Sequence, residues 1–228
     1  MTRLAALALF ALPVALAQEP GPPRLPRDKL LVYRGADGKA AEVKTIADWE
    51  KRRAEVVRGM ESVMGKFPGA DRRGPLDLKV ESETDAGSYV RRLVTYATDS
   101  GPAGRVPAWL LIPKAALNGK KAPAVLALHP TDNTIGHNVA VGLGGKANRA
   151  YAAELAERGY VVLAPSYPLL AKYQPDLKAL GFESGTMKAI WDNSRGLDLL
   201  ESLPYVEGKR FAAVGHSLGG HNSVYTAV

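Results

Sequence analysis

One short run near the end of the chain constrains the fold more than any other feature: Gly215-His216-Ser217-Leu218-Gly219-Gly220. An apolar run of strand length, Arg210 to Val214, precedes it, and Leu218 to Val228 can open a helix that packs on that strand. A serine between glycines at a strand-to-helix turn is typical of a nucleophile elbow, whose strained backbone exposes the hydroxyl. The extra Gly220 is expected to let the helix approach the sheet closely. The alternative is a glycine-rich turn with an incidental serine.

Ser217 would be the nucleophile of this elbow, with the positive end of the following helix beside its hydroxyl. The backbone N–H of Leu218 would point at an oxyanion as it develops. A serine nucleophile also needs a histidine base and a carboxylate. In folds that use this elbow both partners come later in the chain, and little sequence follows Ser217.

A second oxyanion donor usually comes from the loop after the third strand of such a fold. Here that loop is residues 129–133, with the sequence His-Pro-Thr-Asp-Asn. We expect the N–H of Thr131 to be this donor, because Pro130 has no N–H. The alternative is an ordinary turn in which Asp132 or Asn133 caps backbone groups.

No histidine is well placed in the sequence to be the base of Ser217. The chain has four: His129, His137, His216 and His221. We expect His216 to point away from Ser217, His221 to pack within its helix, and the other two to position the loop after the central strand. No histidine pair has metal-ligand spacing with a carboxylate, so we predict no metal site and no cofactor.

Two other patterns have structural interpretations. The run Val141-Gly142-Leu143-Gly144-Gly145-Lys146 superficially suggests a phosphate-binding loop, but it follows no strand and lacks the Ser or Thr after lysine. We interpret it as a flexible loop. Asp192, Arg195 and Asp198 share one side of a predicted helix, where an ion pair is expected.

The composition allows one sizeable globular core, since 46% of the 228 residues are apolar. There is no cysteine, which excludes disulfides. The formal charge is +7, but the basic residues are scattered among acidic ones and no aromatic-basic module occurs. We therefore expect a mixed solvated surface and no nucleic-acid partner.

The N-terminus has the pattern of a signal peptide. Arg3 gives the positive start, Leu4 to Leu16 is apolar but too short to span a bilayer, and Ala15-Leu16-Ala17 is a small-x-small cleavage site. We expect cleavage near Ala17, at the end of a signal peptide over residues 1–17, with export to the periplasm or the extracellular space and no stable membrane anchor. Residues 18–28 contain four prolines and are predicted to be an extended linker.

The remaining chain divides into a helical extension at residues 29–75 and an α/β domain at residues 76–228. Thr45 is expected to cap a helix that runs to about Lys66, and Ile46, Trp49, Val56, Met60 and Val63 form an apolar face expected to pack in a core. In the α/β domain, alternation at residues 76–81 predicts a half-buried strand. Strands over 89–97 and 106–112 are predicted to form an antiparallel hairpin that turns near residues 99–102.

An alternation of strands and helices follows the hairpin. Strands are predicted at 124–128, 160–164 and 210–214, and helices at 147–158, ending at Gly159, and at 186–202. The run at 124–128 is continuously apolar, as in a central parallel strand. The pattern predicts a mostly parallel sheet with flanking helices.

From about Leu76 to Val228 the chain resembles the α/β-hydrolase superfamily. The resemblance rests on Leu128-His129-Pro130-Thr131, on Gly159 to Pro165, and on the Ser217 run. Together with the stretch from Ile190 to Leu200, it is similar to the branch of dienelactone hydrolases and acetyl xylan esterase-like enzymes. The resemblance implies an α/β-hydrolase fold, and the family's acid and histidine have no counterpart here.

The resemblance further implies strands beyond the elbow, so we expect the chain to be the N-terminal part of a longer gene product, C-terminally truncated after the elbow. The expected activity is that of a secreted serine hydrolase acting on small-molecule or carbohydrate esters through an acyl-enzyme, and we expect the chain alone to be nearly inactive. Two alternatives remain open: a non-catalytic α/β-hydrolase-like domain that binds a partner or carbohydrate, and a peptidase of the prolyl oligopeptidase type.

Overall fold

A computed structural model describes residues 24–99 and 104–228, without the side chain of Lys209. The expected signal peptide at residues 1–17, residues 18–23 of the expected linker and residues 100–102 of the expected turn lie outside the described residues. The chain forms two compact units, the first ending at Glu55 and the second beginning at Val56.

The first unit contains a β-hairpin that is followed in the sequence by the start of a helix. Strands β1 (Val32–Arg34) and β2 (Ala40–Glu42) pair antiparallel, and α1 (Ile46–Met64) follows them. The hydroxyl of Thr45 accepts the N–H of Asp48 at 3.2 Å, and the Asp48 carboxylate accepts the Thr45 N–H at 3.2 Å. This reciprocal capping box starts the helix where the sequence predicts it.

The apolar face of α1 contains no buried residue. Ile46 and Val63 are 82% and 83% exposed. Because α1 crosses the boundary between the two units, the expected packing of this face in a core stays a prediction. Helical spacing predicts which residues share a face, but it does not predict whether another element covers that face.

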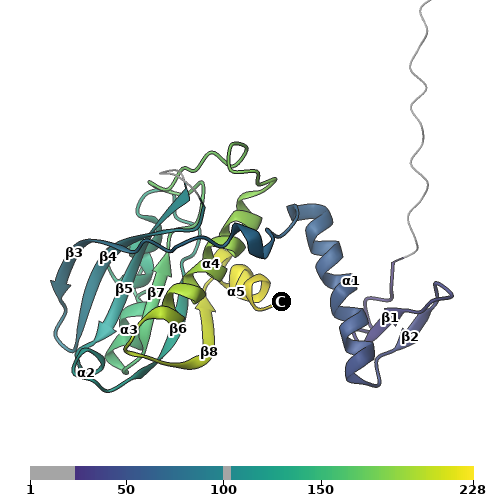
Figure 1. The fold of residues 1–228 in the computed structure, drawn as a ribbon, viewed down its shortest axis with the longest axis horizontal. Coiled ribbons are helices and arrows are strands. Elements are labelled where there is room, and N and C mark those ends of the chain that lie inside the picture. Colours follow the sequence, from purple (N-terminus) through teal and green to yellow (C-terminus); the bar gives the residue numbers. More distant parts are fainter. Residues whose placement is uncertain (1–23, 100–103) are drawn as a thin grey trace, which may run out of the picture. The chain divides into compact units, whose positions relative to one another are not determined.

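The second unit is built on a mixed, mostly parallel sheet of six strands in the order β3-β4-β5-β7-β6-β8 (Figure 1). The strands are β3 (Lys79–Asp85), β4 (Tyr89–Ala97), β5 (Arg105–Pro113), β6 (Ala122–Leu128), β7 (Val161–Pro165) and β8 (Val206–Gly215). Neighbouring strands from β3 to β7 pair antiparallel, and β6 pairs parallel with β7 and with β8, so β4, β6, β7 and β8 share one direction. The predicted β4–β5 hairpin and the predicted parallel β6 are confirmed.

The first strand of this sheet differs from its prediction. All seven residues of β3 are exposed, because β3 is the edge strand of the sheet and pairs only with β4 in the described structure. Leu76 and Leu78 precede the strand and pack against the core, whereas Val80 is 51% exposed. The alternating residues 76–81 therefore do not form a half-buried strand. Leu76 and Leu78 are partly buried in the segment before β3, and β3 itself is exposed.

Helices flank the sheet on both faces. They are the short α2 (Lys114–Leu117), α3 (Tyr151–Glu157), α4 (Gly185–Ser202) and α5 (Leu218–Ala227). The hydroxyl of Ser184 caps α4 by accepting the N–H of Met187 at 3.1 Å. Helix α3 begins four residues later than predicted, after Asn148 adopts a left-handed conformation with φ 59°. Gly159 follows its end with φ 93°, as predicted.

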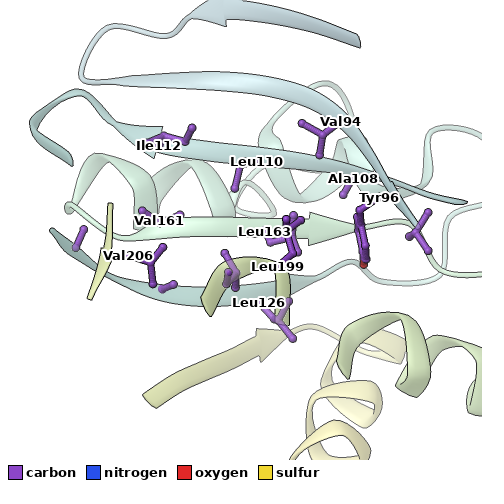
Figure 2. Packing of buried hydrophobic residues seen from close by; sticks show 14 of the residues in the cluster. Val94, Tyr96, Ala108, Leu110, Ile112, Leu126, Val161, Leu163, Leu199 and Val206 are labelled. Atoms are coloured by element: carbon purple, nitrogen blue, oxygen red, sulfur yellow. The ribbon is translucent and has the colours of Figure 1, made fainter. Parts of the chain in front are cut away.

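The core has two layers, because successive residues of a central strand point to opposite faces. On β7, Leu163 belongs to one cluster with Leu199 of α4, and Val162 belongs to the other with Ala152 of α3. Figure 2 shows the first cluster, in which Leu110, Leu163 and Leu126 lie on three neighbouring strands. The sheet therefore forms the middle layer of the second unit.

A buried charge network joins α4 to the β4–β5 hairpin. The Lys188 ammonium contacts the carboxylate of Asp192 and lies 3.0 Å from that of Asp99, and all three side chains are at most 2% exposed. Asp192 also accepts hydrogen bonds from Thr98 at 2.9 Å and Tyr173 at 3.0 Å. Of the residues predicted to pair on this helix, Arg195 and Asp198 form the expected ion pair. Asp192 instead pairs with Lys188.

The carboxyl ends of β6 and β8 meet at one edge of the sheet. Leu128, the last residue of β6, pairs with Gly215, the last residue of β8. The loop from His129 and the turn at Ser217 both leave the sheet at this point. The fold thus brings together two segments that the sequence separates by more than eighty residues.

Candidate active site

Ser217 occupies a strained turn between β8 and α5. Its backbone has φ 54° and ψ −118°, a combination of angles that residues other than glycine rarely adopt. The turn is held by hydrogen bonds from Gly219 N–H to the His216 carbonyl at 3.0 Å and from His221 N–H to the Ser217 carbonyl at 3.1 Å. The strand, turn and helix predicted around Ser217 are therefore present, with the serine side chain exposed.

The glycines of the run are required by close backbone packing. A Cβ on Gly215 would lie 2.3 Å from the backbone carbon of Gly219, and a Cβ on Gly219 would lie 1.8 Å from the carbonyl oxygen of Leu128. At Gly220 the nearest atom would be 3.3 Å away. The close approach of α5 to the sheet therefore depends on Gly219 more than on Gly220, which the sequence analysis singled out.

Ser217 and Thr131 line the same cleft, which has a volume of about 320 Å³. Leu218 is the first residue of α5, directly after Ser217. In the described part of the chain, the N–H groups of Leu218 and Thr131 donate to no other protein atom. Neither amide has a protein acceptor among the described residues, and their role as oxyanion donors stays a prediction.

The loop after β6 is held in place by its own polar side chains. One oxygen of Asp132 accepts the N–H groups of Thr134 at 2.8 Å, Ile135 at 2.7 Å and Gly136 at 3.3 Å. These bonds hold the pKa of Asp132 below its usual range. Asp132 is thus the backbone cap that the sequence allowed as an alternative, and in that position it also lines the cleft.

His129 fixes the start of the same loop. It is 2% exposed, its Nδ1 lies 2.7 Å from the Pro130 carbonyl oxygen, and its Nε2 lies 3.0 Å from the N–H of Tyr167. Nδ1 therefore carries the proton, and Nε2 accepts a hydrogen bond. Burial lowers the pKa of this imidazole. His129 positions the loop, as expected.

None of the four histidines hydrogen bonds to Ser217. His137 is 2.6 Å from the Ser166 hydroxyl through Nδ1, and burial lowers the pKa of His137 to about 3. His221 stacks on the ring of Tyr225 with 5.3 Å between centroids. His216 lines the Ser217 cleft, although we expected it to point elsewhere, because the tight turn keeps both residues at the cleft wall.

Tyr151 is a site residue that the sequence analysis did not single out. Its hydroxyl donates to the carbonyl oxygen of Leu128 at 2.6 Å, so the first residue of α3 anchors the end of β6 beside the elbow. Burial raises the pKa of Tyr151 to about 12, opposed by a backbone hydrogen bond with His216 and by the charge of Arg149. No periodicity or motif in the sequence marks this residue.

Neither a metal-binding cluster nor a membrane-spanning helix occurs among the described residues. No group of three or more His, Cys, Asp or Glu side chains there could hold a metal ion. No helix in that part of the chain is long and apolar enough to cross a lipid bilayer.

The sheet order, the two helical layers and the strand-turn-helix at Ser217 together define an α/β-hydrolase fold, as predicted. Among the solved structures that are similar to the chain are the following three esterases. A glucuronoyl esterase from Solibacter usitatus matches with a TM-score of 0.65 and 22% identity over 90% of this chain and 61% of its own. A glucuronoyl esterase from Teredinibacter turnerae matches with a TM-score of 0.55 and 19% identity, over 86% of this chain and 52% of its own. An acetyl xylan esterase from a Thermoanaerobacterium species matches with a TM-score of 0.51 and 16% identity, over 76% of this chain and 53% of its own.

The chain thus spans about 61% of the length of the first of these esterases and about half of the others. No protein-family model matches the sequence, and no curated protein matches it either. At these identities the comparison establishes the fold, and it leaves the chemistry of Ser217 to be argued from the site.

Proposed function

We propose that this chain belongs to a serine hydrolase that cleaves carboxylic esters, with Ser217 as the nucleophile. The observation that carries the proposal is the backbone of Ser217, at φ 54° and ψ −118° on the wall of a cleft. Strain of about 1–3 kcal/mol at one residue persists only where the surrounding structure enforces it, and such residues cluster at active sites. The esterases with the same fold support the choice of an ester as substrate.

In the proposed reaction the Ser217 hydroxyl attacks the acyl carbonyl and forms an acyl-enzyme, which water then hydrolyses. The N–H groups of Leu218 and Thr131 stabilise the oxyanion, since both are free of protein acceptors and belong to the two segments that meet at Ser217. Removing one such donor typically costs about a hundredfold or more in rate.

The base and the acid of the reaction are proposed to come from outside these 228 residues. His129 and His137 are engaged with Tyr167 and Ser166, and none of the four histidines reaches Ser217. We propose that the chain alone shows almost no turnover, because a serine without its base loses several orders of magnitude in rate. The absence of a histidine hydrogen-bonded to Ser217 in this chain also favours the second candidate, a non-catalytic binding domain of this fold.

A serine-reactive fluorophosphonate distinguishes the two candidates. In the protein at the length its gene encodes, peptide mass spectrometry should find the adduct on Ser217, and Ser217→Ala should abolish it. Ser166→Ala is the matched control, because Ser166 also contacts a histidine but is only 8% exposed. It should leave labelling intact. Absence of any adduct on Ser217 would favour the binding domain.

The 228-residue chain gives a complementary test. Its hydrolysis of p-nitrophenyl acetate should be no faster than that of its Ser217→Ala variant. Robust turnover that depends on Ser217 would show that the chain contains a base which the structure does not place at the serine.

We also propose export. The proposal rests on Arg3, the apolar run from Leu4 to Leu16 and the small residues before Gln18. N-terminal sequencing of the protein recovered from outside the cytoplasm should begin at Gln18. Recovery of the intact N-terminus from the cytoplasm alone would refute it.

A further inference from the structure

Two cations on the wall of the Ser217 cleft have no counter-charge of their own. Lys146 and Arg149 line the cleft, and neither forms an ion pair with a carboxylate in the part of the chain that the structure describes. Most arginines of the sheet domain differ in this respect. Those paired with a carboxylate are Arg72, Arg73, Arg92, Arg105, Arg158 and Arg195. What sets Lys146 and Arg149 apart is their place, because they line the cleft that also contains Ser217.

The acidic side chain among the cleft-lining residues already binds backbone groups. Asp132 lines the cleft, but three backbone N–H groups of its own loop bind one of its oxygens. With Lys146 and Arg149 counted as positive and Asp132 as negative, the ionised lining has a net charge of +1. An anion entering the cleft meets a favourable field that falls with added salt.

Arg149 lies close to the elbow. Its charge acts on the hydroxyl of Tyr151, which in turn donates to the carbonyl oxygen of Leu128, the partner of Gly215. Arg149 is half-buried, which strengthens its interactions relative to a fully solvated cation, whereas Lys146 is exposed. The arginine is the better placed of the two to fix an anion near Ser217.

We propose that this cleft selects esters that carry a carboxylate elsewhere in the molecule, and that Arg149 and Lys146 recognise this carboxylate. The planar guanidinium suits a carboxylate because it donates two parallel hydrogen bonds, and Lys146 adds a second positive charge. This inference rests on the proposed function for the identity of the ester, but recognition of the anion does not require the Ser217 hydroxyl.

Binding of amide analogues tests the inference without turnover. The probes are the mono-(4-nitroanilide) of succinic acid, which carries a free carboxylate, and its neutral counterpart with a primary amide in that position. Their dissociation constants for the whole 228-residue chain are measured by NMR titration at low and high salt. The carboxylate probe should bind about five- to tenfold more tightly at low salt, the range expected of a charge-assisted contact in a half-open cleft.

Variants assign the preference to the two cations. Arg149→Gln should remove most of it, and the double variant Arg149→Gln/Lys146→Gln should abolish it. Lys178→Gln, at an exposed lysine outside the cleft lining, should leave it unchanged. A preference below about twofold in the unchanged chain, or one that survives the double variant, would overturn the inference.

Ser217→Ala separates this inference from the proposed function. The variant should keep the carboxylate preference while losing the fluorophosphonate adduct. If the full-length protein shows no fluorophosphonate label on Ser217 but the carboxylate probe still binds more tightly, only the hydrolase proposal is contradicted. If Ser217 is labelled but the carboxylate probe binds no more tightly than the neutral one, only the anion site is contradicted.

Discussion

The carbonyl oxygen of Leu128 occupies the space that a side chain on Gly219 would need, because a Cβ there would come within 1.8 Å of it. The end of β6 and the first turn of α5 therefore touch backbone to backbone. Gly219→Ala should destabilise the fold by about 3 kcal/mol or more, since backbone atoms cannot yield as a flexible side chain does. Urea denaturation followed by circular dichroism measures the loss.

Gly220→Ala is the control for this prediction, because Gly220 lies in the same helix and its Cβ would come no closer than 3.3 Å to its nearest atom, the carbonyl oxygen of Gly215. Steric crowding and the higher helix propensity of alanine should nearly cancel, which leaves a change within about 1 kcal/mol. Equal losses in the two variants would show that close packing at residue 219 is not what the run requires.

The strained backbone of Ser217 predicts an unusual order of stability among its variants. Ser217→Gly should be more stable than Ser217→Ala by about 1 kcal/mol or more, because only glycine adopts φ 54° with ψ −118° at low cost. Thermal unfolding of the two variants gives the comparison. If alanine proves equal or better, the turn stores no strain.

His137 should make the chain sensitive to mild acid. Burial lowers the pKa of His137 to about 3, below the unfolded value of about 6.5. Between these two pH values the unfolded chain binds a proton that the folded chain does not. Stability is therefore fully present above about pH 6.5 and falls as the pH falls toward about 3.

His137→Gln removes this titration. Between pH 6.5 and 5 the unchanged chain should lose about 1.5 kcal/mol more stability than the variant. His221→Gln serves as the matched substitution control, since His221 is exposed and stacks on Tyr225 in α5. If the free energy of unfolding fell equally with pH in the unchanged chain and in His137→Gln, the acid sensitivity would not come from His137.

The buried Lys188 network should be sensitive to loss of its cation. Lys188→Met leaves the buried carboxylate of Asp192 without its cation, whereas Asp99 keeps its ion pair with Arg72, and the change should cost about 3–5 kcal/mol. Adding Asp192→Asn should restore part of the loss, because it removes one uncompensated charge. Denaturant titrations of the single and double variants provide the comparison.

An exposed pair provides the contrast for Lys188. Lys114 and Asp85 are 2.7 Å apart with side chains 42% and 68% exposed, so Lys114→Met should change stability by less than about 1 kcal/mol. A similar cost at both lysines would mean that burial does not govern the effect.

The sheet could be predicted from local patterns because its central strands are covered on both faces. Continuous apolar runs mark β6 and β7, and the glycines around Ser217 mark the turn after β8. Such signals lie within a few residues of the element that they predict. The strained turn at Ser217 belongs to the same class, because its glycines are neighbours in the sequence.

Features that depend on distant partners had no comparable signal. Lys188 looks like a solvent-facing residue of a helix, and its partner Asp99 lies 89 positions earlier in the chain. Arg149 reaches the Ser217 cleft only because β6 and β8 are neighbours in the sheet. Helix α1 shows the converse, since its apolar spacing is clear while nothing in the sequence states whether it is covered.

The outer border of β8 matters for any sample of these 228 residues. Among the described strands β8 pairs only with β6, and Ala212, Ala213 and Val214 are exposed in its C-terminal half. In such a sample the unpaired backbone groups of this border can pair with an extended segment of another molecule, and none of these three side chains is charged. Ala213→Lys should therefore extend the concentration range in which the 228-residue chain stays dispersed.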